Sequence, residues 1–432
     1  MVDTPEGTDA PAGTGGAETV VAPKPDDQPR PGTFAAFASP AFRLYWASTS
    51  AYFLVQGMQR FAYVWLVIAI SDRPGVAGMA GFALGIPAFV LTLPAGVYSD
   101  RIDRRKIIAG SHAVAVAGTL AVAVLVWSGV MTVEIALLSA VAVGVTTAVS
   151  QPSIQAVVPS LVPGERLMNA IVLKNMGQNL AMMLGAGLVG VVIAVWGIGG
   201  AFAAQAGAYA LAAALMAAVR LPAQPSAEAR QSMRSELAAG IRFVVADRRL
   251  LMLVLLSMVT GLFMLGPVFV LMPEIAKERL GQDALTASLL FLITSAGMFA
   301  MSFALASRQE MPNKGMLFLI ALAVSGPIIS GMGLSSSYAL TMLLMFVWGL
   351  GGGIFVNINQ TLVQMHTPPA MMGRVMAIYT LAIAGFMPLG SLLAGAGASA
   401  IGASAWLVVC GAVLGPVALI TLLTQGSLRR MS

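Results

Sequence analysis

The chain has 432 residues, of which 58% are hydrophobic and only 10% are charged, whereas an ordinary soluble domain has roughly 25% charged residues. This balance excludes a soluble globular protein and indicates an integral membrane protein. The formal net charge of +6 could suggest nucleic-acid binding, but basic residues in the loops between membrane spans account for it, so no nucleic-acid partner is expected.

Residues 1–35 form a polar segment rich in proline, glycine and acidic side chains. Such a composition buries too little apolar surface to fold, which predicts a disordered tail. The segment lacks the basic start and apolar core of a secretory signal peptide. We therefore expect it to remain as a cytoplasmic tail.

Continuous apolar runs follow the tail and predict an all-α membrane protein. A hydrocarbon core about 30 Å thick needs roughly 20 apolar residues per helix, and runs without strict alternation favour helices over a β-barrel. The predicted fold has twelve transmembrane helices in two pseudo-symmetric bundles of six. The predicted spans are 44–68, 76–98, 107–128, 134–157, 170–194, 200–219, 250–272, 284–305, 315–333, 338–363, 374–397 and 403–424.

A polar stretch over 221–247 separates the first six spans from the last six. It divides the chain into an N-terminal bundle, 36–220, and a C-terminal bundle, 248–432. The segment SELAAGIRFVVADRRL in and just after this linker has the pattern of an amphipathic helix at the cytoplasmic surface. Most basic residues lie in the tail and the even-numbered loops, which predicts a multi-pass protein with both termini in the cytoplasm. Arg outnumbers Lys, and Ala and Gly are abundant, which suggests a bacterial source and hence the inner membrane.

Polar side chains on the first span fall on one face of the helix, at about 100° per residue. A polar face on a membrane helix is expected to line a cavity. Arg60 lies near the middle of the span, where an arginine costs roughly 2.5–3.5 kcal/mol, so it is a candidate for substrate binding or gating. The alternative is a structural arginine held by neighbouring amides and carbonyls. The cavity candidates on this span are Tyr52, Gln56, Gln59, Arg60 and Tyr63.

The fourth and tenth spans carry polar residues at a helical spacing. They add Thr147, Gln151, Gln155, Asn357, Gln360 and Gln364 to the cavity candidates. These side chains could contact substrate, and hydrogen bonding between helices is an equal claim.

The segment GVYSDRIDRRK, 96–106, is a dense charge cluster between two spans. It resembles the loop between the second and third helices of major facilitator transporters, although Asp103 replaces a glycine of the usual pattern. GMQRFAYVWLV (57–67), PSIQAVVPSLVPGERLMNAI (152–171) and MGRVMAIYTLAIAGFMPLGSLLAG (372–395) resemble the bacterial exporter branch that includes the enterobactin exporter and the macrolide efflux proteins. The resemblance implies two six-helix bundles that rock about a central cavity, lined by the first, fourth, seventh and tenth helices.

The resemblance also implies a cytoplasmic latch between the two bundles, in which Asp100 faces the start of the eleventh helix. A loop that only sets topology would explain the basic charge, but it would not explain Asp100. The predicted latch residues are Asp100, Arg101, Arg104, Arg105, Glu165 and Arg374.

No Asp or Glu lies near the middle of a predicted span. A buried cationic substrate needs a carboxylate partner, whereas this cavity offers Arg60. We therefore expect neutral or anionic amphipathic substrates. Proton coupling is implied by the resemblance, and the titratable candidates for it are Glu134, His112 and Asp100.

These observations predict a secondary transporter that exports a siderophore, an antibiotic or a drug. A facilitator or lipid flippase of the same fold, and a membrane receptor or scaffold that does not transport, are the alternatives. An enzyme is not expected, because only His112 and His366 are available and no nucleophile, base and acid occur together. No cofactor or metal is expected, and neither is a disulfide, since Cys410 is alone. The expected partners are a small-molecule substrate, the lipid bilayer and protons, with the protein a monomer.

Overall fold

The computed structural model describes residues 34–73, 75–101, 104–219, 233–307 and 313–431, without the side chains of residues 92–101, 233–236 and 306. All regular secondary structure in these ranges is helical. Within these ranges, ten helices are long and apolar enough to cross a membrane. The predicted class, an all-α membrane protein, is confirmed.

The first half of the chain forms η2 (Ala35–Ala38), α1 (Pro40–Ile70), α2 (Val76–Arg101), α3 (Arg104–Trp127), α4 (Val133–Val157), η3 (Val158–Ser160) and α5 (Gly164–Ala218). Helix α5 has 55 residues and contains two of the predicted spans, 170–194 and 200–219. They join at Gly197, whose φ of 71° interrupts the helical backbone. Glycine adopts this left-handed conformation without the steric penalty of a Cβ atom.

The second half forms α6 (Met233–Ala246), α7 (Arg248–Thr260), a π-helical turn η4 (Gly261–Leu265), α8 (Gly266–Glu278), α9 (Ala284–Ala306), α10 (Lys314–Leu334), α11 (Tyr338–Met365), η5 (Pro369–Met371), α12 (Met372–Ala384), α13 (Phe386–Ile401), α14 (Ala403–Thr424) and α15 (Gly426–Arg429). The seventh span was predicted to end at residue 272. It continues through α7, η4 and α8 to Glu278, because Pro273 lies inside α8 without ending it.

Helix starts coincide with capping side chains. The Ser39 side chain accepts a hydrogen bond from the amide of Phe42 at the start of α1, and Thr132 accepts one at the start of α4. Asp283 caps α9 and Ser337 caps α11. Each cap satisfies a backbone amide that the first turn of a helix leaves unpaired.

The predicted amphipathic helix of the linker is present as α6, which packs against α12. Gly240 and Val244 lie one turn apart and are buried, whereas Ile241 and Arg242 are exposed. A Cβ atom at Gly240 would lie 3.1 Å from the Cβ of Arg374. One face of α6 therefore covers the start of α12.

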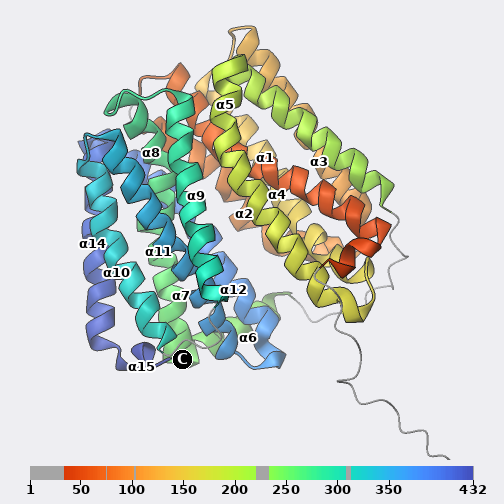
Figure 1. Ribbon diagram of the computed structural model, residues 1–432, viewed down its shortest axis with the longest axis vertical. Helices are drawn as coiled ribbons and strands as arrows, with labels where there is room; N and C mark the ends of the chain where they lie inside the picture. Colours follow the sequence, from red (N-terminus) through yellow and green to blue (C-terminus); the bar gives the residue numbers. More distant parts are fainter. Residues whose placement is uncertain (1–33, 74, 102–103, 220–232, 308–312, 432) are drawn as a thin grey trace, which may run out of the picture.

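The two halves form separate bundles, which meet at the top of Figure 1 and diverge toward the bottom. In the first bundle α1 packs against α5 and α2 against α4; in the second, α10 packs against α14 and α9 against α11. We call the end where the bundles meet the joined end. The opposite end, with α6 and α15, is called the terminal end (Figure 1).

Several helix pairs connect the bundles, among them α2 with α13, α5 with α9, α2 with α8 and α1 with α8. A Cβ atom at Gly78 of α2 would lie 2.5 Å from the carbonyl oxygen of Ser391 in α13. The Ser288 hydroxyl in α9 donates a 3.3 Å hydrogen bond to the Gly187 carbonyl in α5. These small residues allow the backbones to approach closely, as is common in membrane helix packing.

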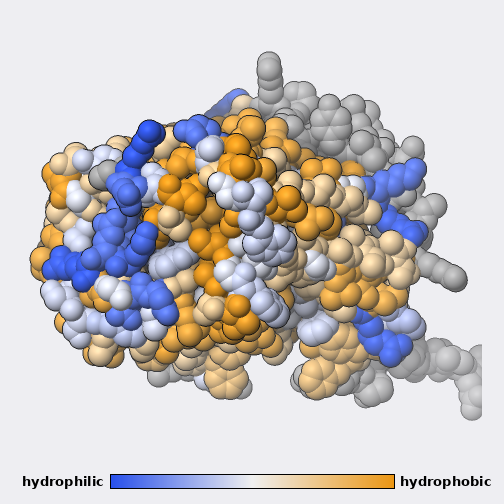
Figure 2. Space-filling view, turned by 90° about the horizontal axis from the view of Figure 1, so that it is seen from above, coloured by the Kyte–Doolittle hydropathy of each residue, from blue (hydrophilic) through white to orange (hydrophobic). Residues whose placement is uncertain are grey.

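Figure 2 views the joined end from above. Hydrophilic side chains gather on the left, over the second bundle, and much of the remaining surface is hydrophobic. Exposed hydrophobic residues such as Leu138, Val195 and Leu423 lie on the outside of the helices. This distribution suits a protein surrounded by lipid.

Candidate functional site

The polar face of α1 makes a hydrogen-bonded network inside the first bundle. Gln56 Nε2 donates to Thr147 Oγ1 at 3.1 Å and to Tyr209 Oη at 3.2 Å. Gln59 Nε2 donates to the same Tyr209 oxygen at 3.3 Å. The network joins α1, α4 and α5, so the hydrogen bonding between helices that the sequence left open for the fourth span is present for Thr147.

The tyrosines of α1 also lie within the first bundle. Tyr52 is buried, its hydroxyl is 3.4 Å from Ser150 Oγ, and its ring stacks on His112 with 5.2 Å between centroids. The ring of Tyr63 meets Phe202 edge-on at 4.9 Å. Tyr52 and Tyr63, near the two ends of this polar face, are therefore packed against neighbouring helices.

Arg60 is directed toward the second bundle. Its Cζ atom lies 5.6 Å from the ring centroid of Phe269 in α8, a distance typical of a cation–π interaction. Phe269 stacks on Phe291 of α9 at 5.6 Å, and Phe61 of α1 contacts the same Phe291 ring at 5.8 Å. An aromatic cluster from both bundles thus surrounds a half-buried guanidinium.

No carboxylate of the described residues forms an ion pair with Arg60. The guanidinium keeps its five donors and its full charge. An anionic or hydrogen-bond-accepting group that reached this position would find both a cation and flat aromatic surfaces.

The remaining amides occupy more open positions. Gln151 is half-buried, and Gln155 is exposed and accepts a hydrogen bond from Lys174 Nζ. On α11, Asn357 Nδ2 donates to Ser302 Oγ at 2.8 Å, and Gln360 and Gln364 are exposed. The exposed amides of α4 and α11 therefore lie mainly near the terminal end of the molecule.

Sequence reasoning missed the buried amide of Asn359. Its Nδ2 donates to Ser257 Oγ in α7 at 2.8 Å, and its Oδ1 is buried without a partner among the described residues. Asn359 lies off the helical face that Asn357 and Gln360 suggested. Only its hydrophobic neighbours in the sequence could have indicated burial.

The latch residues are placed in part. Arg104 Nη1 donates to the Ala156 carbonyl at 2.9 Å, and Arg105 donates to the Ala217 carbonyl, both within the first bundle. Arg374 Nη1 lies 3.7 Å from Met371 Sδ. Glu165 is exposed in the first turn of α5. The side chains of Asp100 and Arg101 lie outside the described residues, so the latch stays a prediction.

The proposed coupling residues differ in their surroundings. His112 is buried, and among the described residues neither ring nitrogen has a hydrogen-bond partner. Glu134 is exposed in the first turn of α4. Asp100 again lies outside the described side chains.

A second missed residue is Glu274 of α8, which is only 5% exposed. Its Oε2 atom is buried and has no hydrogen-bond partner in the described part of the chain. Glu274 was not counted among residues within a span, because the seventh span was predicted to end at residue 272. After Pro273 only Ile275 and Ala276 are apolar before Lys277, so the sequence carried little signal that the helix continues.

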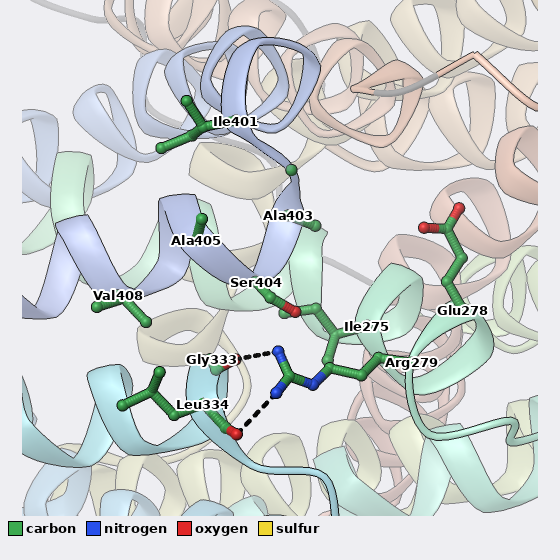
Figure 3. A pocket seen from close by; sticks show the side chains of 11 residues that line it. Ile275, Glu278, Arg279, Gly333, Leu334, Ile401, Ala403, Ser404, Ala405 and Val408 are labelled. Atoms are coloured by element: carbon green, nitrogen blue, oxygen red, sulfur yellow. Dashed lines mark hydrogen bonds between the residues drawn. The ribbon is translucent and has the colours of Figure 1, made fainter.

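A cavity of about 410 Å³ lies at the joined end of the second bundle, between α8, α10, α13 and α14. Arg279 lies beside it and donates to the carbonyls of Gly333 and Leu334 at 3.0 and 2.8 Å (Figure 3). Ile401 and Val408 add apolar walls. No predicted site residue lines this cavity, so it is separate from the Arg60 site.

Known proteins resemble the chain over most of its length. The family model described as transmembrane secretion effector matches residues 31–431. Macrolide efflux protein A of Streptococcus pyogenes is 21% identical over 385 residues, covering 88% of this chain and 94% of the relative. The enterobactin exporter EntS of Citrobacter koseri is 25% identical over 397 residues, covering 90% and 93%.

Solved structures show the same fold. A bacterial homolog of the human lysosomal transporter Spinster, inward-facing and occupied, superposes with a TM-score of 0.72 at 13% identity, covering 94% of this chain and 98% of that chain. A mutant of the nucleoside transporter NupG gives a TM-score of 0.72 at 14% identity, covering 90% and 99%. The family-model match over residues 31–431 shows that the chain belongs to the transmembrane secretion effector family, within the major facilitator superfamily of transporters.

Proposed function

We propose that the protein is a secondary transporter that exports a small neutral or anionic amphipathic molecule across the bacterial inner membrane. Transport proceeds by alternating access and is coupled to protons. Two relatives support export, since they are named as a macrolide efflux protein and an enterobactin exporter. The protein acts as a monomer.

The proposed topology has twelve membrane spans. Ten candidate spans are described, α5 among them holds two predicted spans, and α2 supplies one more with its 26 residues. Positive loops and the tail put both termini in the cytoplasm. The units are a tail (1–35), an N-terminal bundle (36–220), a linker (221–247) and a C-terminal bundle (248–432).

In this topology the joined end faces the outside and the terminal end faces the cytoplasm. Bundles that meet at only one end suit the cytoplasm-facing stage of alternating access. The latch of Asp100, Arg101, Arg104 and Arg105 with Glu165 and Arg374 would form when the terminal end closes. His112 and Glu134 remain candidates for the coupling step.

The observation that carries the substrate class is Arg60. It is a cation between the bundles, next to Phe269 and without a carboxylate partner among the described residues. Anions and acceptor-rich neutral molecules gain from such a group, whereas a lipophilic cation is repelled by it. Phe61, Phe269 and Phe291 supply the apolar surface that an amphipathic molecule needs.

Efflux from cells that overproduce the protein tests this function. We expect an acidic siderophore to be exported, its export to collapse when the proton gradient is dissipated, and Arg60→Gln to abolish it. Arg43→Gln is the matched control, because Arg43 lies exposed in the first turn of the same helix. Strong efflux of a cationic dye that persists in Arg60→Gln would contradict the substrate class. Export that continues unchanged after the proton gradient is dissipated would identify a facilitator or flippase.

A further inference from the structure

The contact between the bundles at the joined end includes one buried acid. Glu274 lies in α8 between Val270 and Lys277, at positions about one helical turn apart on the same side. A Cβ atom at Gly81 of α2 would lie 2.6 Å from Val270 Cγ2. Lys277 Nζ donates to the Ile68 carbonyl of α1. This side of α8 therefore faces the first bundle.

Neighbouring contacts set the depth of Glu274. Arg60 of α1 meets Phe269, and Ile68 of α1 meets Lys277. These two contacts show which parts of α1 and α8 lie side by side, and they put Glu274 beside the last two turns of α1. Residues 61–68 of α1 are all buried. The carboxyl is thus inside the contact and not in either loop.

The carboxyl has few groups that could stabilise a negative charge. Helix α8 packs against α1, α2, α9, α13 and α14. Residues 76–91 of α2 and the whole of α9 and α13 carry no charged or titratable side chain, and α14 carries only Cys410. On the remaining elements and the adjoining loops, the charged groups nearest in sequence to this contact are Arg60, Asp72, Arg73, Lys277, Glu278 and Arg279. Arg279 is bonded to the carbonyls of Gly333 and Leu334 in α10.

None of these groups pairs with Glu274 among the described residues, where Oε2 has no partner. Arg60 is directed at Phe269, and Lys277 is bonded to α1. Asp72, Arg73 and Glu278 are exposed. An ionised carboxylate held away from water without a partner is strongly disfavoured, and taking up a proton removes that cost.

We propose that Glu274 is a proton-binding site whose protonation allows the joined end to close. When this end is open, Glu274 reaches water and Lys277 is released from Ile68, so the carboxylate is stable beside a free ammonium three residues away. One proton converts the carboxylate to the neutral acid, which can enter the contact. The inference rests on the proposed function and adds the residue that binds the coupling proton and the step that the proton drives.

The test follows the width of the joined end without any substrate. Spin labels are placed at Val130→Cys in the α3–α4 loop and Ala339→Cys in α11, in a Cys410→Ala background, because both sites are exposed at this end. Distances are measured between about pH 5 and about pH 9, because a buried carboxyl with a raised pKa titrates within this range. We expect a short distance in acid and a growing population of longer distances as the pH rises.

Glu274→Gln should keep the short distance over the whole range, since it mimics the neutral acid. Glu278→Gln, one turn away and exposed, should still show a distance that depends on pH. Glu274→Asp should restore titration, which shows that the Gln effect is not misfolding. A Glu274→Gln protein that retains the original pH profile would overturn the proposal, and so would distances that never change with pH.

The two proposals fail separately. If no siderophore is exported but the distance responds to pH through Glu274, the proposed function is contradicted and the proton site stands. If export is normal and Glu274→Gln has the original profile, the proton site is contradicted alone.

Discussion

The guanidinium of Arg60 in α1 lies over the ring of Phe269 in α8, with Cζ 5.6 Å from the ring centroid. This contact joins the two bundles in the middle of the apolar region. A half-buried arginine and an aromatic face from opposite bundles can serve both a substrate and the contact between the bundles. The effects of changing each partner separate these two roles.

Phe269→Leu should weaken the contact without removing the charge. A cation–π interaction contributes about 0.5–2 kcal/mol, depending on how far the cation is desolvated, so we expect the spin-label distance at the joined end to shift toward the open population. Phe303→Leu is the control, because Phe303 is exposed on α9. Equal distances for the two variants would show that the ring does not hold the bundles together.

Gly78→Ala should hinder closure of the joined end. The new Cβ would lie 2.5 Å from the Ser391 carbonyl oxygen, and rigid backbone on both sides leaves little room to adjust. We expect export to be lost while the purified protein remains folded. Gly207→Ala is the control, since a Cβ there would meet nothing within 4 Å; normal export by Gly78→Ala would refute the close-packing explanation.

Tyr209→Phe should destabilise the first bundle. The substitution removes the acceptor of two hydrogen bonds, from Gln56 and Gln59, and hydrogen bonds between membrane helices contribute about 0.6–1.7 kcal/mol each. Thermal unfolding in detergent should show a lower midpoint. Tyr379→Phe, a buried tyrosine whose hydroxyl makes no hydrogen bond to the described residues, should change the midpoint less.

Arg279→Gln should loosen the end of α10. The guanidinium bonds two terminal carbonyls of that helix (Figure 3), and a cation at a helix C-terminus contributes about 0.3–1 kcal/mol. We expect faster hydrogen exchange of the last turn of α10. Glu278→Gln, its exposed neighbour, should leave that exchange rate unchanged; equal acceleration in both variants would argue against the cap.

Asp283 should make the start of α9 sensitive to acid. Hydrogen bonds from the hydroxyl and amide of Thr286 hold the pKa of the Asp283 carboxyl below its usual value. A depressed pKa contributes stability above the unfolded pKa of about 3.9, and this contribution is lost as the pH falls through the folded pKa. Unfolding temperatures below about pH 4 should fall more in the unmodified protein than in Asp283→Asn. Parallel curves for the two proteins would exclude this titration as a source of acid sensitivity.

Local properties of the chain were readable from the sequence. Long apolar runs predicted a helical membrane protein, because span length and the need to satisfy backbone groups in lipid depend only on nearby residues. The charge cluster at 96–106 and three further segments pointed to the correct family. The amphipathic pattern of the linker predicted the helix that is present as α6.

Burial and partners depended on helices that lie far apart in the sequence. Gln56 and Gln59 were correctly placed on one polar face of α1, but only packing showed that Tyr209, about 150 residues later, receives both of their hydrogen bonds. Glu274 was missed because the seventh span was ended at residue 272, and its burial comes from packing between the bundles. The sequence by itself determined the class, the family and the arginine in the middle of α1; the tertiary structure decided that Arg60 faces Phe269 and that Glu274 is buried, because side-chain environment is set by contacts between the bundles.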